Sequence, residues 1–322
     1  VKAGSHLHQV SELSAIAFDK TGTLTQGRPQ VTDTLLSAEA EQLLAVWVSM
    51  ERQANHPLAQ AIVAHYASLP VLDLEVSNQM GQGLYADYQG HSYQLAKPTA
   101  FEAVAPDYER QRLEWESQGK TVVYLAQNQE VLGAMALMDM AKDDARQTLD
   151  YFKQVGVKTV MLTGDAELTG QAIGQQLGIQ SVQAQVMPDQ KAEEIRKLMG
   201  KHQMVAMVGD GINDAPALAQ ADVGLAIGRG TDVAIESADM VLMGSDLTSV
   251  STAIKLSQAT IRNIKENLFW AFAYNVLGIP VAMGVLHLFG GPLLNPMLAG
   301  AAMSFSSVSV IVNALRLRRF KA

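Results

Sequence analysis

Short apolar runs recur along the chain, and most of them end in a loop rich in Gly, Asp or Thr. Segments whose apolar residues recur at helical spacing lie between these runs. This alternation predicts an α/β fold, with a parallel sheet covered by helices on both faces. Such sheets bind ligands at the carboxyl ends of their strands, where these loops lie. The expected strands are 14–18, 157–162, 204–208, 223–227 and 240–243, and the expected helices are 143–155, 167–177 and 189–199.

The pattern changes between about residues 31 and 128, where helical stretches precede short strands with Gly-rich turns. This change predicts a separate α+β domain inserted into the first one. Within it we expect a helical region over 38–68 that breaks at Pro57, short strands over 75–95, a helix over 101–119 and a strand over 121–126. The first domain is then expected to comprise 1–30 and 129–255, and the inserted domain 31–128.

Two long apolar runs follow near the end of the chain. Residues 268–289 contain one ionisable side chain, His287, and residues 293–315 contain none. Each run has roughly the 20 residues that a helix needs to cross a bilayer. Basic residues flank the pair on both sides, which predicts a hairpin over 262–319 with both ends in the cytoplasm. A buried hairpin of a large soluble protein is the alternative.

Charge and cysteine content narrow the function classes. The 322 residues carry a formal net charge of −8, which argues against broad electrostatic binding to nucleic acid. With no cysteine, the chain has no disulfide framework, thiolate metal site or Cys nucleophile. Residues 1–10 have no apolar core of a secretory signal, and the first residue is not Met. We therefore expect the chain to begin inside a longer protein.

Asp19 has the setting of a nucleophile toward a phosphoryl group. It ends the first apolar run and begins the sequence Asp19-Lys20-Thr21-Gly22-Thr23. A carboxylate at a strand end can attack phosphorus, and Gly22 allows a tight turn whose N–H groups face phosphate oxygens. A lone Asp-rich loop is more often a turn or a helix N-cap. The interpretation therefore depends on the other loops that accompany it.

Three later segments supply complementary groups. Thr163-Gly164-Asp165 adds a hydroxyl, and residues 209–214 add carboxylates. Carboxylates are the oxygen ligands that Mg²⁺ prefers, and the metal would neutralise charge during phosphoryl transfer. Lys191 is a candidate positive clamp on the phosphoryl group.

With their flanking residues, these loops resemble the signature sequences of P-type ATPases. The matches lie at 18–25, 163–165 and 209–218, and the resemblance covers nearly the whole chain. It implies a haloacid-dehalogenase-like, Rossmannoid phosphorylation domain in which ATP phosphorylates Asp19. It also implies that Asp19, the Thr21 carbonyl and Asp210 hold Mg²⁺. The other residues to which it gives a role at this site are Lys20, Thr163, Lys191, Asn213 and Asp214.

Thr21 separates a pump from a phosphatase. Related phosphatases carry a second Asp at this position, two residues after the nucleophile, as a general acid and base. Without that group, hydrolysis of the aspartyl phosphate should be slow, as a pump requires. A membrane-anchored phosphatase of the same superfamily and a non-catalytic binding module are the alternatives. The non-catalytic module is disfavoured because the chain retains Asp19, Lys191, Asp210 and Asn213.

The inserted domain contains no GxxxxGK[ST] loop, so a Walker loop does not hold the nucleotide. His56-Pro57 by itself reads as a helix break, and residues 81–83 by themselves read as a turn. Together with Glu51 they resemble the nucleotide-binding domain of the heavy-metal-transporting branch. That branch often has a Gly-Asn or similar pair near the position of Ala96-Lys97, which this chain lacks. The resemblance implies ATP contacts from Glu51, His56, Gly81, Gly83, Thr163, Gly164 and Asp165.

Polar residues of the C-terminal pair favour monovalent copper as the transported ion. A Ser in a membrane helix is usually a packing residue, and a lone Met usually faces lipid or core. Their arrangement here nevertheless resembles the copper-type signature. A thioether suits Cu(I), and neither run holds an Asp or Glu of the kind expected in a zinc-type pump. The resemblance implies a site for Cu(I), or the similar Ag(I), made of Tyr274, Asn275, Met303, Ser306 and Ser307.

The resemblance also implies more protein than this chain contains. In the family, earlier membrane helices carry a Cys-Pro-Cys pair and an actuator domain carries a dephosphorylating Glu, and neither is present here. We expect the catalytic and C-terminal portion of a copper exporter in the bacterial plasma membrane, with its catalytic domains in the cytoplasm. Its partners would be ATP, copper, the membrane and the missing N-terminal part. A zinc or cadmium pump is the nearest rival.

Overall fold

The computed structural model describes residues 2–79, 82–211, 213–228, 232–283, 285–291 and 296–317. The chain divides into two compact units. One is Ser14–Thr248, and the other joins Val1–Leu13 to Ser249–Ala322. Residues 1–13, which the sequence placed with the first domain, therefore cluster with the C-terminal helices instead.

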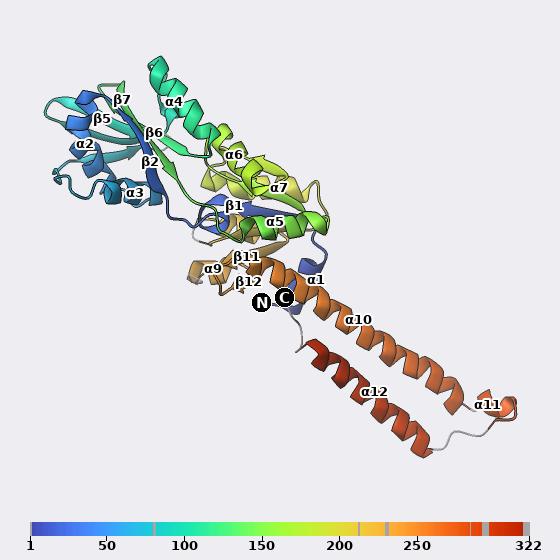
Figure 1. Ribbon diagram of the computed structural model, residues 1–322. Coiled ribbons are helices and arrows are strands. Elements are labelled where there is room, and N and C mark those ends of the chain that lie inside the picture. The colour runs from blue at the N-terminus through green and yellow to red at the C-terminus, as the bar shows by residue number, and fades with distance from the viewer. Residues whose placement is uncertain are drawn as a thin grey trace. The chain divides into compact units, whose positions relative to one another are not determined.

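The first unit is built around a parallel sheet with β1 (Ala15–Asp19) near its centre (Figure 1). The strand order is β12-β11-β10-β1-β8-β9, and every pairing is parallel. All residues of β1 are buried, which explains why this strand reads as a continuous apolar run. The predicted parallel sheet is confirmed. Its other strands are β8 (Lys158–Leu162), β9 (Ser181–Gln183), β10 (Val205–Gly209), β11 (Val223–Ile227) and β12 (Met240–Leu242).

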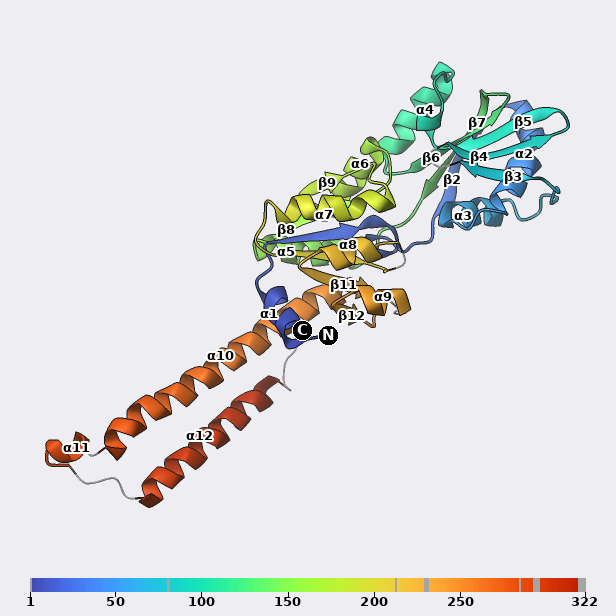
Figure 2. The same ribbon diagram turned by 180° about the vertical axis from the view of Figure 1, so that it is seen from behind.

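Successive residues of β1 point to opposite faces of this sheet, and all of them are buried. Helices therefore cover both faces. Ala17 packs in one cluster with Ile195 and Leu218, whereas the Phe18 ring lies 6.0 Å from the Phe152 ring on the other side. Figure 1 shows α5 in front of β1, and Figure 2 shows α7 and α8 in front of it from behind. These helices are α5 (Ala145–Gln154), α6 (Glu167–Leu177), α7 (Lys191–Met199), α8 (Ala215–Gln220) and α9 (Asp232–Ser237).

A second, antiparallel sheet carries the inserted residues, in the order β2-β7-β6-β5-β4-β3. On β6, Val123 and Leu125 join the core beneath α2 and α3, while Val122 and Tyr124 pack with Trp115 of α4. The sheet includes β7, so it extends past the expected boundary at residue 128. Its elements are β2 (Gln30–Leu36), α2 (Ala38–Glu51), α3 (Pro57–His65), β3 (Val76–Gln79), β4 (Gly83–Tyr88), β5 (His91–Ala96), α4 (Pro106–Ser117), β6 (Thr121–Gln127) and β7 (Glu130–Met138).

The other unit consists of helices: α1 (Gly4–Ser11), α10 (Thr248–Ala282), α11 (Val285–Leu288) and α12 (Pro296–Arg316). Asparagine side chains join α10 to α12. Asn263 donates to the Asn313 carbonyl at 2.8 Å, and Asn313 donates to Asn267 Oδ1 at 2.9 Å. Within the part of the chain that the structure describes, no helix combines the length and the apolar character that crossing a bilayer demands.

Gly83 allows a test of the close approach of β4 to β5. Its φ is +90°, and a Cβ atom there would lie 2.3 Å from the Leu95 carbonyl oxygen. Gly83→Ala should therefore lower the free energy of unfolding by about 3 kcal/mol or more, because backbone atoms must move apart. Gly90→Ala is the matched control: its φ is +81° with no atom within 4 Å, so only the backbone cost of about 1 kcal/mol remains. Equal losses in urea unfolding would contradict the steric account.

Candidate active site

Asp19 lies at the carboxyl end of β1 in a three-residue charge cluster. The residue is 6% exposed, and Lys191, the first residue of α7, donates from Nζ to Asp19 Oδ1 at 2.6 Å. The same ammonium donates to Asp214 Oδ1, also at 2.6 Å. Gly209 makes room for Asp214, because a Cβ there would lie 2.6 Å from Asp214 Oδ2. One buried cation thus serves two buried carboxylates, an arrangement of these three residues that the sequence did not predict.

The cluster perturbs the protonation of its members. Burial, followed by the charge of Asp214, raises the pKa of Asp19 to about 7, although Lys191 opposes the rise. Burial also raises the pKa of Asp214. Burial alone would lower the pKa of Lys191, but the two carboxylates outweigh it and raise that pKa. Lys191 is therefore an ammonium, and Asp19 needs further positive charge nearby to be a fully ionised nucleophile.

The residues expected to hold Mg²⁺ face one cavity of about 880 Å³. Asp19, Thr21 and Asp210 all line it, and so does Asn213, which was expected to support the site. Asp210 is close enough to raise the pKa of Asp19, and a Cβ on Gly22 would lie 3.4 Å from Asp210 Oδ2. Among the described residues, no group of three or more His, Cys, Asp or Glu side chains forms a metal centre. Two carboxylates and one carbonyl still fit Mg²⁺, which usually keeps several water ligands.

Lys20 and Asp165 form a second buried ion pair, with Lys20 Nζ 2.5 Å from Asp165 Oδ2. Burial alone would raise the pKa of Asp165, but Lys20 and hydroxyl donors outweigh it and lower that pKa. Thr163 donates to the same carboxylate at 2.9 Å, and Thr121 of β6 donates to it at 3.0 Å. Asp165 therefore ties the second sheet to the loop after β8. The sequence did not predict that Thr121 contacts Asp165.

Asp139 joins the two chain segments that connect the sheets. Thr25 Oγ1 donates to Asp139 Oδ2 at 2.5 Å, and the amides of Gly27 and Arg28 donate to the same carboxylate at 3.2 and 3.0 Å. Asp139 is the residue directly after β7. Its partners lie more than a hundred residues away along the chain. Sequence reasoning missed Asp139 because nothing local distinguishes it from a turn residue.

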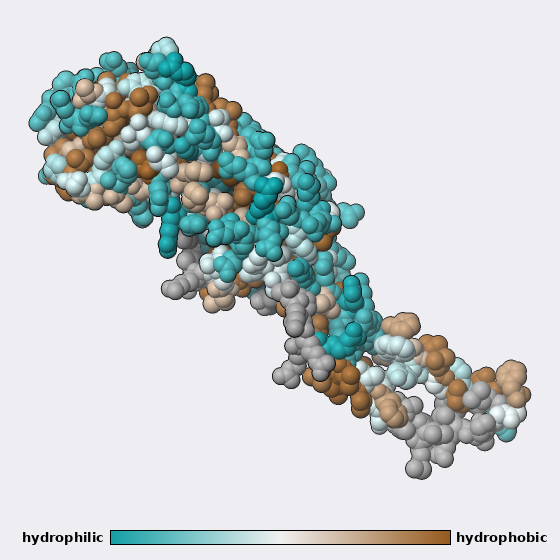
Figure 3. All heavy atoms as spheres, viewed as in Figure 1, coloured by the Kyte–Doolittle hydropathy of each residue, from teal (hydrophilic) through white to brown (hydrophobic). Residues whose placement is uncertain are grey.

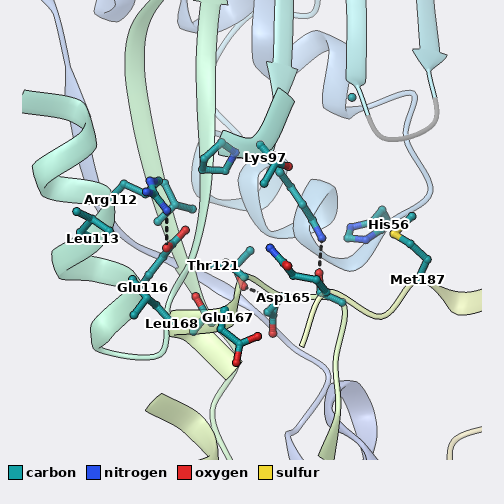
Figure 4. A pocket seen from close by; sticks show the side chains of 18 of the residues that line it. His56, Lys97, Arg112, Leu113, Glu116, Thr121, Asp165, Glu167, Leu168 and Met187 are labelled. Carbon is teal, nitrogen blue, oxygen red and sulfur yellow. Dashed lines mark hydrogen bonds and ion pairs between the residues drawn. The ribbon is translucent and has the colours of Figure 1, made fainter. Parts of the chain in front are cut away.

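The residues expected to bind nucleotide are only partly brought together. His56 and Gly83 line a cavity of about 580 Å³ with Gly164 and Asp165 (Figure 4). His56 Nδ1 accepts from the Leu58 amide at 3.2 Å, and burial, then the charge of Lys97, lowers the pKa of His56.

Two of the predicted nucleotide residues that the structure describes, Glu51 and Thr163, do not line this cavity, and Thr163 lines the cavity of about 880 Å³ instead. Glu51, at the end of α2, is 6% exposed. Gly81 lies outside the described residues. Lys97, which also lines the cavity, was not predicted as a site residue.

The residues expected to bind copper lie on two helices of the other unit. Tyr274 and Asn275 belong to α10, and Ser306 and Ser307 belong to α12. Asn275 donates to the Ala271 carbonyl at 2.9 Å, a bond within its own helix. Met303 is also in α12, but its side chain lies outside what the structure describes. Their grouping into one metal site stays a prediction.

Comparison with known proteins agrees with this architecture. The family model of haloacid dehalogenase-like hydrolases matches residues 13–222. The chain is 47% identical, over 99% of its own length and 45% of the relative, to the probable copper-transporting ATPase PacS of Synechocystis sp.. It is 44% identical to the probable copper-importing P-type ATPase A of Enterococcus hirae, over 99% of this chain and 44% of that protein. The chain thus spans less than half the length of these relatives.

Solved structures are similar as well. A zinc-transporting PIB-type ATPase in its E2.Pi state aligns with a TM-score of 0.71 and 36% identity, covering 98% of this chain and 52% of that one. The catalytic domain of the CPx-ATPase CopB-B aligns with a TM-score of 0.62 and 28% identity, covering 79% of this chain and 94% of that domain. The likeness to CopB-B thus covers most of this chain and nearly all of that domain.

Glu51 should make stability depend on pH. Burial raises its pKa to about 7 in the folded chain, whereas an unfolded Glu ionises near pH 4.3. The folded state therefore keeps an extra proton between these values, and the free energy of unfolding falls as pH rises through this window. Glu51→Gln removes the titration, so at pH 8 it should be more stable than the parent by up to about 3 kcal/mol.

Urea unfolding at pH 4 and pH 8 measures the effect of Glu51→Gln. The two chains should be equally stable at pH 4. Glu41→Gln, at an exposed position of the same helix, is the control and should match the parent at both values. A difference between the parent and Glu51→Gln that is the same at pH 4 and pH 8 would show that Glu51 does not titrate in this window.

Proposed function

Because this chain belongs to the haloacid dehalogenase-like hydrolase family, we propose that its first unit transfers the terminal phosphoryl group of ATP to Asp19. One observation carries the proposal. The Asp19 carboxylate, held by a buried ammonium at the end of a central strand, lines the same cavity as Asp210 and His56. That cavity therefore contains a nucleophile, Asp19, and an oxygen ligand for a metal, Asp210. It also contains the His56 ring, which can stack on a base.

Each residue of the site has its own role in the proposed phosphoryl transfer. Lys191 orients Asp19 Oδ1 and offsets its charge, while Gly22, with a φ of +75°, allows the tight turn that would present backbone N–H groups to phosphate oxygens. A bond forms between an Asp19 oxygen and the terminal phosphorus as the bond to the departing ADP breaks. Asp19, the Thr21 carbonyl and Asp210 would hold Mg²⁺, which when bound supplies positive charge to the phosphoryl oxygens. Lys20, neutralised by Asp165, positions the loop rather than the phosphate.

We further propose that the complete protein exports Cu(I), with silver(I) as a chemically similar ion. The names of its relatives support copper, although one is named as an importer and others, such as that of Vibrio cholerae, as exporters. The chain is also similar to a zinc-transporting ATPase. The runs 268–289 and 293–315 lack Asp and Glu, which favours a soft ion over zinc or cadmium.

The surface of the C-terminal helices supports a proposal for the place of the protein in the cell. Apolar side chains are exposed along α10 and α12, including Phe269, Leu277 and Phe305, and Figure 3 shows hydrophobic residues gathered on these helices. Exposed apolar surface on this scale marks a membrane or protein contact. We propose that the pair crosses the bacterial plasma membrane beside helices of a missing N-terminal part, with the sheets in the cytoplasm. Tyr274, Asn275, Met303, Ser306 and Ser307 would face the ion.

A phosphatase is the second candidate, because the matched family is one of hydrolases. Thr21 is exposed in the cavity, where a phosphatase of this superfamily would have its acid and base. Slow release of phosphate from Asp19 would therefore favour the pump. Rapid turnover of p-nitrophenyl phosphate would instead support the phosphatase.

Acid-stable labelling tests the proposed reaction. The chain is incubated with γ-labelled ATP and Mg²⁺ and quenched in acid, and it should retain label that hydroxylamine removes. Asp19→Asn should reduce the label to background because it removes the nucleophile. Asp189→Asn, at an exposed carboxylate, is the control and should label like the parent. Label that persists in Asp19→Asn, or no label in a parent shown to bind ATP, would refute the proposal.

Removal of one thioether tests the proposed ion. In the complete pump, Met303→Ala should raise the Cu(I) concentration for half-maximal ATP turnover by about tenfold or more, the cost typical of a disturbed metal site. Met283→Ala removes an exposed thioether elsewhere in the hairpin and should leave that concentration unchanged. An unaltered Cu(I) dependence in Met303→Ala would exclude this residue as a ligand.

A further inference from the structure

Lys97 brings an ammonium group from the second sheet into the cleft of the candidate site. It follows β5, precedes the short helix Pro98–Ala100, and is exposed. Its Nζ donates to the Gly164 carbonyl at 2.8 Å (Figure 4). Gly164 belongs to the loop between Thr163 and Asp165, so the Lys97 side chain spans from one sheet to the loop after β8.

The charge of Lys97 is the one that this cleft leaves unbalanced. Among the described residues that line the two cavities, the other Lys and Arg side chains all have carboxylate partners. The structure gives Lys97 a neutral carbonyl instead. The hydrogen bond of an ammonium becomes stronger when an anionic oxygen replaces a neutral carbonyl as its acceptor. The paired cations are Lys20 with Asp165, Lys191 with Asp19 and Asp214, and Arg112 with Glu109 and Glu116.

The position of Lys97 specifies which anion it meets. It lines both the cavity with His56 and Gly83 and the cavity with Asp19 and Asp210. A nucleotide whose base lies near His56 and whose terminal phosphate reaches Asp19 must therefore pass its phosphate chain beside Lys97. The charge of Lys97 is felt at His56, whose pKa it helps to lower.

We propose that Lys97 binds the polyphosphate chain of the nucleotide and so selects nucleoside di- and triphosphates over nucleosides. The inference rests on the proposed function, since it assigns a phosphate contact within the same site. In the absence of nucleotide, the Gly164 carbonyl takes up the hydrogen bond. When nucleotide binds, nonbridging phosphate oxygens replace that carbonyl, and the ammonium offsets negative charge that the paired lysines cannot.

A purely structural role is the competing account, in which Lys97 only ties the second sheet to the Gly164 loop. The two accounts differ in what they predict for a ligand without phosphate. Loss of a structural tie would weaken adenosine and nucleotide alike, because both need the same cleft. Loss of a phosphate contact would weaken only the ligands that carry phosphate, and would reduce the dependence of their affinity on salt.

Binding of adenosine and of the nonhydrolysable ATP analogue AMP-PCP to the full chain with Mg²⁺ tests the inference by calorimetry. Lys97→Met should weaken AMP-PCP by about tenfold, as expected for loss of a charge-assisted hydrogen bond, and change adenosine affinity by less than about twofold. Lys97→Arg keeps the charge and should recover most of the loss. Lys153→Met, at an exposed lysine of α5, is the matched control and should bind both ligands like the parent.

Each other outcome overturns a defined part of the account. Equal losses for adenosine and AMP-PCP in Lys97→Met would assign the residue a structural role. Unchanged AMP-PCP affinity would remove Lys97 from the nucleotide site while leaving the proposed function intact. A parent chain that binds no AMP-PCP would overturn the proposed function, and this inference with it.

Discussion

The candidate site depends on one buried ammonium that serves two carboxylates. Asp19 and Asp214 are both buried, and Lys191 offsets part of the repulsion that each carboxylate would meet beside the other. Their three backbones come from the end of β1, the loop after β10 and the start of α7. The cluster therefore forms only when β1, β10 and α7 are packed together. In this way the packing of the sheet sets the charge on the nucleophile.

A second set of polar contacts connects this cluster to the inserted sheet. Thr121 reaches Asp165, Lys97 reaches Gly164, and Asp139 holds the two connecting segments together. Each contact joins residues far apart in sequence across the region where both cavities lie. The cleft between the sheets thus has hydrogen-bonding groups on both sides. Such an arrangement suits a ligand that carries a base at one end and phosphates at the other.

The sequence predicted the parts of the fold whose signal is local. Strands β1 and β11 agree with expectation to within one residue, because fully buried strands appear as continuous apolar runs. Strand β2 alternates exposed and half-buried positions and was missed, and β7, also not expected as a strand, lies in residues that were assigned to the first domain. No local pattern distinguishes a strand of one sheet from a strand of the other.

The same limit applies to the site. Asp19 and Asp210 were predicted because they stand in distinctive loops at strand ends, and Lys191, the first residue of α7, was predicted as a positive clamp. Asp139 and Lys97 were not, because their roles come from partners more than sixty residues away. Glu51 was predicted to contact nucleotide, yet it is buried and absent from the described lining of the cavity where His56 lies.

The central claim is that a phosphoryl group is transferred to one particular carboxylate. Reduction of the ATP-treated, acid-quenched chain with borohydride converts an aspartyl phosphate to homoserine, which peptide mass spectrometry can locate. The account predicts homoserine at position 19 and at no other aspartate of the chain. Homoserine elsewhere, or none at position 19 in a sample that binds ATP, would contradict it.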